Sequence, residues 1–174
     1  MVIWDHPDSK EIYVIHPTAM WGTRYIRYKG KKLTNGEVVK YWGKWVVLGE
    51  RKWLDQLAEK LDPYVEDEKI SSIKYTKEPP KDVDIDECVM FVYCDKRERD
   101  EVWSILKEHG VKLKAWITEK ETMEMWMPGG KLYERWIRSN NFNEKEIEAI
   151  KLDIQTTLGN IFNKPDEIYR PWGQ

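Results

Sequence analysis

The sequence predicts an α+β fold in which an antiparallel sheet carries its helices on one face. Residues 44–118 read in the order strand, helix, strand, strand, helix, strand, which is typical of a split βαβ unit. Each expected helix has a single apolar stripe, and such a stripe is stable only against another layer of structure. A chain of 174 residues is long enough for one well-buried core. We therefore expect one α+β domain over residues 1–174, with its core in residues 42–122.

Two segments ahead of the core are expected to extend the sheet as additional strands. Residues 11–16 (EIYVIH) form a short strand pattern that stops at Pro17. Residues 23–33 (TRYIRYKGKKL) alternate polar and apolar side chains around a glycine, which indicates a strand that enters a turn or a hairpin. The pair Asn35-Gly36 predicts a further turn before the next extended run.

The first half of the core is expected to be a strand followed by a helix. Residues 44–49 (KWVVLG) are a short apolar run rich in β-branched side chains, as in a strand. Residues 50–61 follow a helical period and are expected to end at Pro63. The apolar stripe of this helix contains Trp53, Leu54, Leu57, Ala58 and Leu61.

The second half of the core begins with two strands and an exposed loop between them. The strands are expected at residues 70–76 and 88–94, and the acidic, proline-rich loop at 77–87. Residues 88–94 (CVMFVYC) are apolar at both parities, which predicts an interior strand. A helix over 97–110 and a strand over 112–118 complete the unit. The helix carries an apolar stripe and ends at Gly110 as a left-handed cap; the stripe contains Val102, Ile105, Leu106 and His109.

The C-terminal part is expected to be a helical extension over residues 131–163. Before it, Met123, Met125 and Met127 share one parity and would line one side of an extended segment. Such a row is either one apolar face or a soft-ligand set for copper(I). A short helix is expected over 132–137. Asn143 with Glu146 predicts an N-cap that opens a long helix, ending at about residue 162.

Composition excludes several classes of protein. A mean hydropathy of −0.73 with 34% charged residues argues against a membrane span, and the first residues do not resemble a signal peptide. Two cysteines, Cys88 and Cys94, without a secretion signal point to the cytoplasm. The net charge of −2 argues against a general nucleic-acid packaging role. No cofactor is expected.

Positive charge is nevertheless concentrated between residues 24 and 44. Seven basic residues lie in this stretch against Glu37 alone, so the molecule should have one basic edge. Trp21 and Trp42 each adjoin a glycine at its margins, where an exposed ring would stack on a planar ligand. The alternative is that the basic residues protect a sheet edge from pairing with another chain. The candidate ligand-binding residues are Trp21, Arg24, Arg27, Lys29, Lys31, Trp42 and Lys44.

Three functional hypotheses follow from these observations. The leading one is a non-catalytic cytoplasmic binding protein for a nucleotide or an RNA end at the basic, aromatic edge. The second is a protein–protein interaction module that uses the same aromatic residues and the methionine-rich segment. The third is an enzyme with Cys94 as its nucleophile, which requires a base that His6, His16 and His109 do not provide nearby in sequence.

The segments WGKW (42–45), ISSIKY (70–75) and VMFVYCDKRERDEVWSILKEHGV (89–111) resemble a family of small uncharacterised proteins of the basophilic leukaemia-expressed protein type. The resemblance covers residues 42–122 and implies a fold like that of the cap-binding translation initiation factor 4E. Cap-binding factors stack a methylated guanine between two tryptophans and hold its edge with a glutamate beside one of them. Residues 34–41 contain Glu37 but no tryptophan, so the resemblance implies a fold and a site location without the cap-binding pair.

Overall fold

A sheet of six strands is the centre of the first of two compact units in the computed structural model, which describes residues 3–17, 26–81 and 83–170. Unit 1 comprises Met1–Arg24 and Gly43–Ile117, and unit 2 comprises Tyr25–Trp42 and Thr118–Gln174. Each unit buries apolar side chains of its own. The single domain expected from the sequence stays a prediction.

The strand order of the sheet is β1-β2-β6-β7-β5-β8. The pairs β1–β2, β2–β6 and β6–β7 are antiparallel. Strand β7 lies in the interior, as the sequence predicts. Strand β6 pairs with β2 and β7, so β1 and β2 extend the sheet beyond β6. The strands are β1 (Ile3–Trp4), β2 (Glu11–Ile15), β5 (Trp42–Gly49), β6 (Ser72–Thr76), β7 (Cys88–Asp95) and β8 (Trp116–Thr118).

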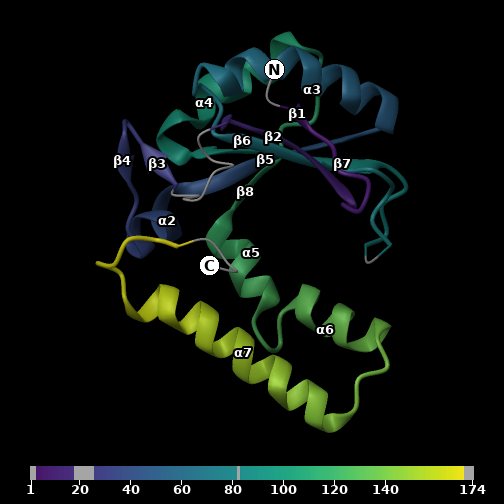
Figure 1. The fold of residues 1–174 in the computed structure, drawn as a ribbon, viewed down its shortest axis with the longest axis vertical. Coiled ribbons are helices and arrows are strands. Elements are labelled where there is room, and N and C mark those ends of the chain that lie inside the picture. Colours follow the sequence, from purple (N-terminus) through teal and green to yellow (C-terminus); the bar gives the residue numbers. More distant parts are fainter. Residues whose placement is uncertain (1–2, 18–25, 82, 171–174) are drawn as a thin grey trace. The chain divides into compact units, whose positions relative to one another are not determined.

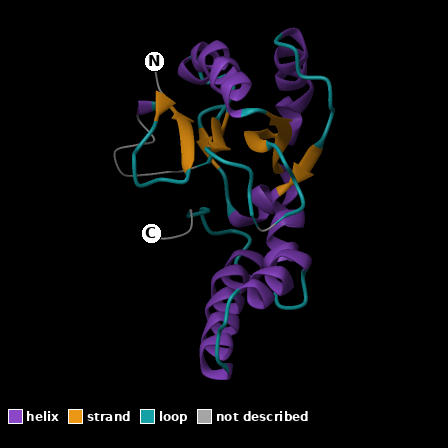
Figure 2. Ribbon diagram, turned by 90° about the vertical axis from the view of Figure 1, so that its right-hand side faces the viewer, coloured by secondary structure: helices purple, strands orange, loops and turns teal. Residues whose placement is uncertain are grey.

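Helices α3 (Arg51–Glu66) and α4 (Arg99–Glu108) both cover one face of this sheet, as Figure 1 and Figure 2 show. A short 3₁₀ turn, η1 (Lys96–Glu98), leads into α4. The apolar stripes of the two helices meet alternate residues of the strands in one buried cluster. This arrangement confirms the predicted α+β architecture with an antiparallel sheet. The centre of the cluster contains Leu54, Leu57, Leu61, Ile73, Met90, Val92, Val102 and Leu106.

The ends of the two helices differ in how well the sequence predicts them. Gly110 has a φ of +95° directly after α4, and the Val111 amide donates to the Leu106 carbonyl, so the predicted left-handed cap is confirmed. Helix α3, by contrast, continues through Pro63 to Glu66. A proline this close to a helix end removes one hydrogen bond, and burial of Val65, two residues later, favours continuation of the helix.

Close packing inside unit 1 depends on Gly43 at the start of β5. A Cβ atom at this position would overlap the ring of Trp116. The Trp116 ring also lies 5.2 Å from the ring of Trp45, edge to face. The absence of a side chain at Gly43 therefore lets β8 bring its tryptophan against β5.

Unit 2 contains four helices and a small hairpin in the part of the chain that the structure describes. The helices are α2 (Asn35–Tyr41), α5 (Glu119–Trp126), α6 (Lys131–Ser139) and α7 (Glu144–Asn163). The hairpin consists of β3 (Arg27–Tyr28) and β4 (Lys31–Lys32), which form a separate two-stranded sheet rather than an extension of the main one. The buried apolar residues of unit 2 include Leu33, Val38, Met123, Tyr133, Leu158 and Ile161.

Helices α2 and α5 lie where the sequence had indicated a turn and an extended segment. Asn35-Gly36 opens α2, because the Thr34 hydroxyl accepts a hydrogen bond from the Glu37 amide and the Glu37 carboxylate accepts one from the Thr34 amide. The methionine segment lies in α5, where Thr118 accepts a hydrogen bond from the Glu121 amide. The predictions of a turn and of an extended methionine row are therefore wrong.

The long C-terminal helix is confirmed with its cap. Asn143 accepts a hydrogen bond from the Glu146 amide at 2.8 Å and donates to the Glu146 carboxylate at 2.8 Å. The short helix predicted over 132–137 is present as α6. None of the helices in the described residues combines the length and apolar character that crossing a bilayer requires.

Replacing Leu57 or Leu106 with Ala is expected to lower the free energy of unfolding by about 2–5 kcal/mol, because each side chain is buried and leaves a cavity. Leu113→Ala is the matched control. Its side chain is 56% exposed, so the change should stay within about 0.5 kcal/mol. Urea denaturation followed by circular dichroism measures all three variants. Equal losses at Leu57 and Leu113 would contradict this placement of the core.

Thr34→Ala is expected to destabilise the protein by about 0.5–2 kcal/mol, because it removes the side-chain cap of α2. Thr34→Ser keeps the hydroxyl group and should retain most of the stability. Thermal denaturation compares the two variants with the parent chain. If Thr34→Ala unfolds at the parent temperature, the cap does not contribute in solution.

Candidate functional site

The face of the sheet opposite α3 and α4 carries aromatic and basic side chains. Successive strand residues point to opposite faces, so each strand contributes every second residue to this surface. Ile12, Ile73 and Met90 belong to the core beneath the helices, and their strand neighbours point away from it. We call this surface the second face. Its members include Glu11, Tyr13, Lys44, Ser72, Lys74, Val89, Phe91 and Tyr93, with Trp4 from β1.

Strand register aligns four of these side chains in a line that crosses the strands. Trp4 pairs with Tyr13, Tyr13 pairs with Lys74, and Lys74 pairs with Phe91. This line, which we call the transverse row, therefore runs across β1, β2, β6 and β7. The Trp4 and Tyr13 ring centroids lie 5.6 Å apart. The Lys74 ammonium lies 5.7 Å from the Phe91 ring.

Lys44 on β5 continues the transverse row beyond Phe91. Its Nζ atom lies 4.7 Å from the Phe91 ring centroid and 5.6 Å from that of Tyr93. The Phe91 and Tyr93 centroids are 6.4 Å apart. The Lys44 residue is only 6% exposed, and burial of an ammonium group is costly unless it is compensated. The Phe91 ring is thus flanked by two ammonium groups, Lys44 and Lys74.

Glu11 occupies the margin of the transverse row and neutralises part of its charge. Its carboxylate lies 3.3 Å from Lys74 Nζ and accepts a hydrogen bond of 2.9 Å from the Tyr13 hydroxyl. The side chains of Lys74 and Glu11 are 31% and 28% exposed. Because both groups are accessible to water, this ion pair contributes little to stability and is open to exchange with another anion.

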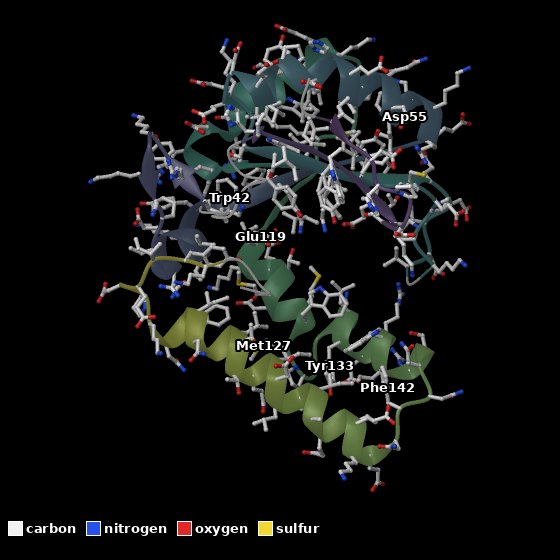
Figure 3. All side chains as sticks on the ribbon, viewed as in Figure 1. Trp42, Asp55, Glu119, Met127, Tyr133 and Phe142 are labelled. Atoms are coloured by element: carbon white, nitrogen blue, oxygen red, sulfur yellow. The ribbon has the colours of Figure 1, made fainter. Side chains whose placement is uncertain are left out.

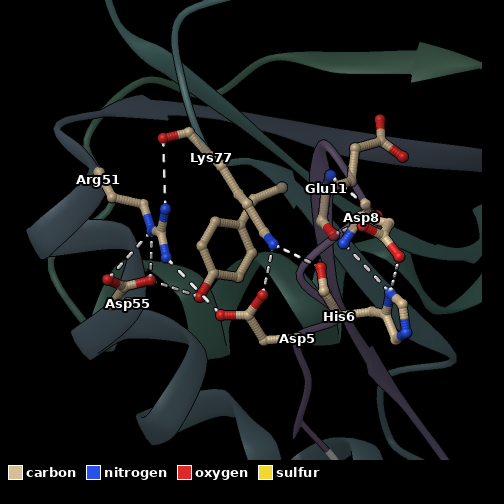
Figure 4. A network of polar contacts seen from close by, with 9 residues as sticks. Asp5, His6, Asp8, Glu11, Arg51, Asp55 and Lys77 are labelled. Atoms are coloured by element: carbon tan, nitrogen blue, oxygen red, sulfur yellow. Dashed lines mark hydrogen bonds and ion pairs between the residues drawn. The ribbon is translucent and has the colours of Figure 1, made fainter.

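The Trp4 end of the transverse row is held in place by Lys77 (Figure 4). Lys77 Nζ donates to the His6 carbonyl at 2.7 Å and pairs with Asp5 Oδ1 at 2.6 Å. Asp5 and His6 directly follow Trp4, and the imidazole ring stacks on the indole ring with 5.5 Å between centroids and an interplanar angle of 18°. The Lys77 hydrogen bond holds the pKa of Asp5 below its ordinary value.

A second part of the same network joins α3 to β6. Arg51 Nε donates to Asp55 at 2.9 Å, and the Tyr75 hydroxyl donates to the same carboxylate at 2.7 Å. Burial and the Asp55 carboxylate both raise the pKa of Tyr75, so its hydroxyl group stays a donor. These bonds fix β6, the strand that carries Lys74.

The structure places the candidate residues of the sequence analysis in different settings. Trp21 and Arg24 lie outside the described residues. Arg27 and Lys31 are exposed on the β3–β4 hairpin, and Lys29 is exposed in its turn, 5.4 Å from the Tyr28 ring. All three belong to unit 2, whereas Lys44 belongs to unit 1.

Trp42, labelled in Figure 3, is 5% exposed. The expectation of an exposed stacking ring at this position is therefore wrong. Its ring fills a core position, which is the usual role of a tryptophan on an apolar strand. Phe91 and Tyr93 were missed by the sequence reasoning, although their alternate spacing in CVMFVYC was the available signal.

Cys94 does not have the environment of a nucleophile. Its side chain is fully buried, and burial raises the pKa of the thiol, with smaller contributions from Glu98 and Asp95. A reactive cysteine needs the opposite shift, toward the thiolate. Within residues 3–17, 26–81 and 83–170, no three His, Cys, Asp or Glu side chains are grouped closely enough to hold a metal ion.

A hollow of about 310 Å³ lies beside the turn after α4. Val47, Leu48 and Trp53 line one part of it, and Gly110 and Leu113 line another. Its two charged side chains, Glu87 and Lys112, are opposite in sign, so the otherwise apolar lining carries no net charge for a phosphate-bearing ligand. The second face is therefore the stronger candidate.

Comparison of the chain with protein-family models, with curated proteins and with solved structures gave no match. The function is accordingly argued from the geometry of the second face alone.

The lowered pKa of Asp5 predicts a pH dependence of stability. A carboxyl group whose pKa is depressed by folding stabilises the protein above its unfolded value of about 3.8, and this contribution is lost as the pH falls through the lower folded value. Asp5→Asn should therefore flatten the decrease of the melting temperature below about pH 4. Asp84→Asn, in an exposed loop, is the control. Identical pH profiles for Asp5→Asn and the parent chain would contradict the Lys77 bond.

Proposed function

We propose that this chain is a non-catalytic binding protein whose ligand is planar and phosphate-bearing: a nucleotide or the end of an RNA. The observation that carries the proposal is the Phe91 ring flanked by the ammonium groups of Lys44 and Lys74, at 4.7 Å and 5.7 Å. Aromatic side chains stack on bases, with about 1–3 kcal/mol per stacked base. Lysine binds phosphate as a point charge.

The two lysines have different roles in this proposal. The Lys74 side chain is 31% exposed, so its ammonium contacts the phosphate directly. The Lys44 residue is 6% exposed, so its buried charge strengthens the positive potential at the rings without touching the ligand.

The finer expectations of the sequence analysis belong to the same proposal. They are a fold like that of initiation factor 4E and a cytoplasmic location, and both stay predictions. The geometry supports a nucleotide site rather than a cap-binding one. Glu37, the only counterpart of the cap-binding glutamate, is engaged as the capping residue of α2.

A protein–protein interaction module is the second candidate, and α7 is the observation in its favour. Ile147, Ile150 and Ile154 on this helix are half-buried, and Leu152 is 67% exposed. The three isoleucines share the face of α7 that buries Leu158 and Ile161, whereas Leu152 lies on the opposite, exposed face and is the apolar side chain available to a partner. A module of this kind binds no nucleotide, so the titration below separates the two candidates.

Phe91→Leu and Lys74→Met are each expected to weaken nucleotide binding. The loss at Phe91 should be roughly 5- to 150-fold, the equivalent of one stacked base. Isothermal titration calorimetry with ATP and GTP in low salt measures the affinities. Lys60→Met on α3 is the matched lysine control, and Phe142→Ala, outside the sheet, is the phenylalanine control.

Both controls should bind as the parent chain does. Absence of binding to the parent chain at millimolar nucleotide would contradict the proposal. Equal losses in Lys74→Met and Lys60→Met would remove the second face as the site.

A further inference from the structure

We propose that the natural ligand is a single strand of nucleic acid several nucleotides long, which lies across the strands along the transverse row. This inference rests on the proposed function and specifies its substrate class. The register places Trp4, Tyr13, Lys74 and Phe91 directly opposite one another on four neighbouring strands. A mononucleotide at Phe91 leaves the Trp4 end of this line without a role.

The length of the row matches an oligonucleotide. Neighbouring strands lie about 4.8 Å apart, so the three steps from β1 to β7 cover about 14 Å. Nucleotides of one stacked strand rise by about 3.4 Å each. The row therefore covers about four nucleotide steps, before Lys44 on β5 is included.

Aromatic and cationic side chains follow one another along the row, as bases and phosphates do along an oligonucleotide. The aromatic pair Trp4 and Tyr13 is followed by the cation Lys74 and then by the aromatic ring of Phe91, which Tyr93 flanks on the same strand. Bases need stacking surfaces and phosphates need positive charge. Sheets that recognise RNA in other proteins stack two or three bases on aromatic side chains of their strands.

The Trp4 end is prepared to accept a planar ring. Trp4 is 36% exposed and already carries the His6 imidazole stacked at 18°. Lys77 holds the segment that joins the two rings, through the His6 carbonyl and the Asp5 carboxylate. A base bound here therefore meets an ordered surface rather than a loop that must be ordered on binding.

Glu11 provides a test that does not depend on a loss of function. Its carboxylate holds Lys74 at 3.3 Å in the unliganded protein. A phosphate at Lys74 must replace this carboxylate and also lie near its negative charge. Glu11→Gln removes that competition and is expected to tighten oligonucleotide binding.

Fluorescence anisotropy with labelled octanucleotides tests the proposal on the full chain. The probes are single-stranded octa-adenylate as RNA and as DNA, an RNA duplex and, by competition, AMP. We expect both single strands to bind at least tenfold more tightly than AMP and the duplex. The ratio of RNA to DNA affinity reports contacts to the 2′-hydroxyl groups.

Variants at the two ends of the row separate this inference from the proposed function. Tyr13→Leu and Trp4→Leu should each weaken octanucleotide binding by roughly 5- to 150-fold, one stacked base, and Trp4→Leu should leave AMP binding unchanged. Phe91→Leu should weaken both. Lys74→Met should reduce the slope of log affinity against log salt by about 0.7. Tyr64→Leu, on α3 beside His109, is the matched tyrosine control.

Each alternative outcome has a defined meaning. If AMP binds as tightly as the octanucleotides and Tyr13→Leu changes neither, the inference is wrong and the proposed function stands. Equal affinity for the duplex and the single strands also overturns the inference, because it indicates backbone electrostatics alone. If neither AMP nor an octanucleotide binds, both proposals fail.

Discussion

Burial of the α3 and α4 stripes against one face of the sheet determines which side chains occupy the other face. Strand residues alternate between faces, so a register shift by one residue would exchange the two sets completely. Leu57 and Leu106 are buried among the core-facing residues of β6 and β7, and this packing holds the register. The same register brings Tyr13, Lys74 and Phe91 into line on the second face. The stability of the sheet and the arrangement of the candidate site thus depend on the same alternation of strand residues between the two faces.

The contacts now present on the second face are weak enough, in free energy, for a bound ligand to replace them. A cation–π contact at an accessible site contributes about 0.5–1 kcal/mol, and an exposed ion pair such as Lys74–Glu11 contributes about 0–1 kcal/mol. A stacked base contributes about 1–3 kcal/mol. The contacts that a base over Phe91 displaces are thus no stronger than the stacking that replaces them, about 0.5–2 against about 1–3 kcal/mol. The buried Lys44 ammonium lies against the Phe91 and Tyr93 rings, and it is not displaced when a base stacks on the accessible side of the second face.

The sequence predicted the sheet and its helices well, because apolar periodicity is strong in each element of the core. It failed where two local signals competed: Asn35-Gly36 indicated a turn, but the capping box of Thr34 and Glu37 decided the structure. The methionine row was misread for the same reason, since Thr118 begins a helix. The candidate site was missed because Phe91 and Tyr93 count as apolar in a strand that is apolar at both parities. Only the strand register, which sequence alone does not give, aligns them with Trp4 and Tyr13.

The central claim is that the second face binds a single strand of nucleic acid, and a nuclear magnetic resonance titration tests it most directly. Amide chemical shifts of the labelled chain are followed as an octanucleotide RNA is added. We predict that the largest shifts occur in β2, β6 and β7 around Tyr13, Lys74 and Phe91, while the solvent-facing residues of α3 and α4 are unaffected. Shifts confined to the β3–β4 hairpin, or to α7, would contradict the claim.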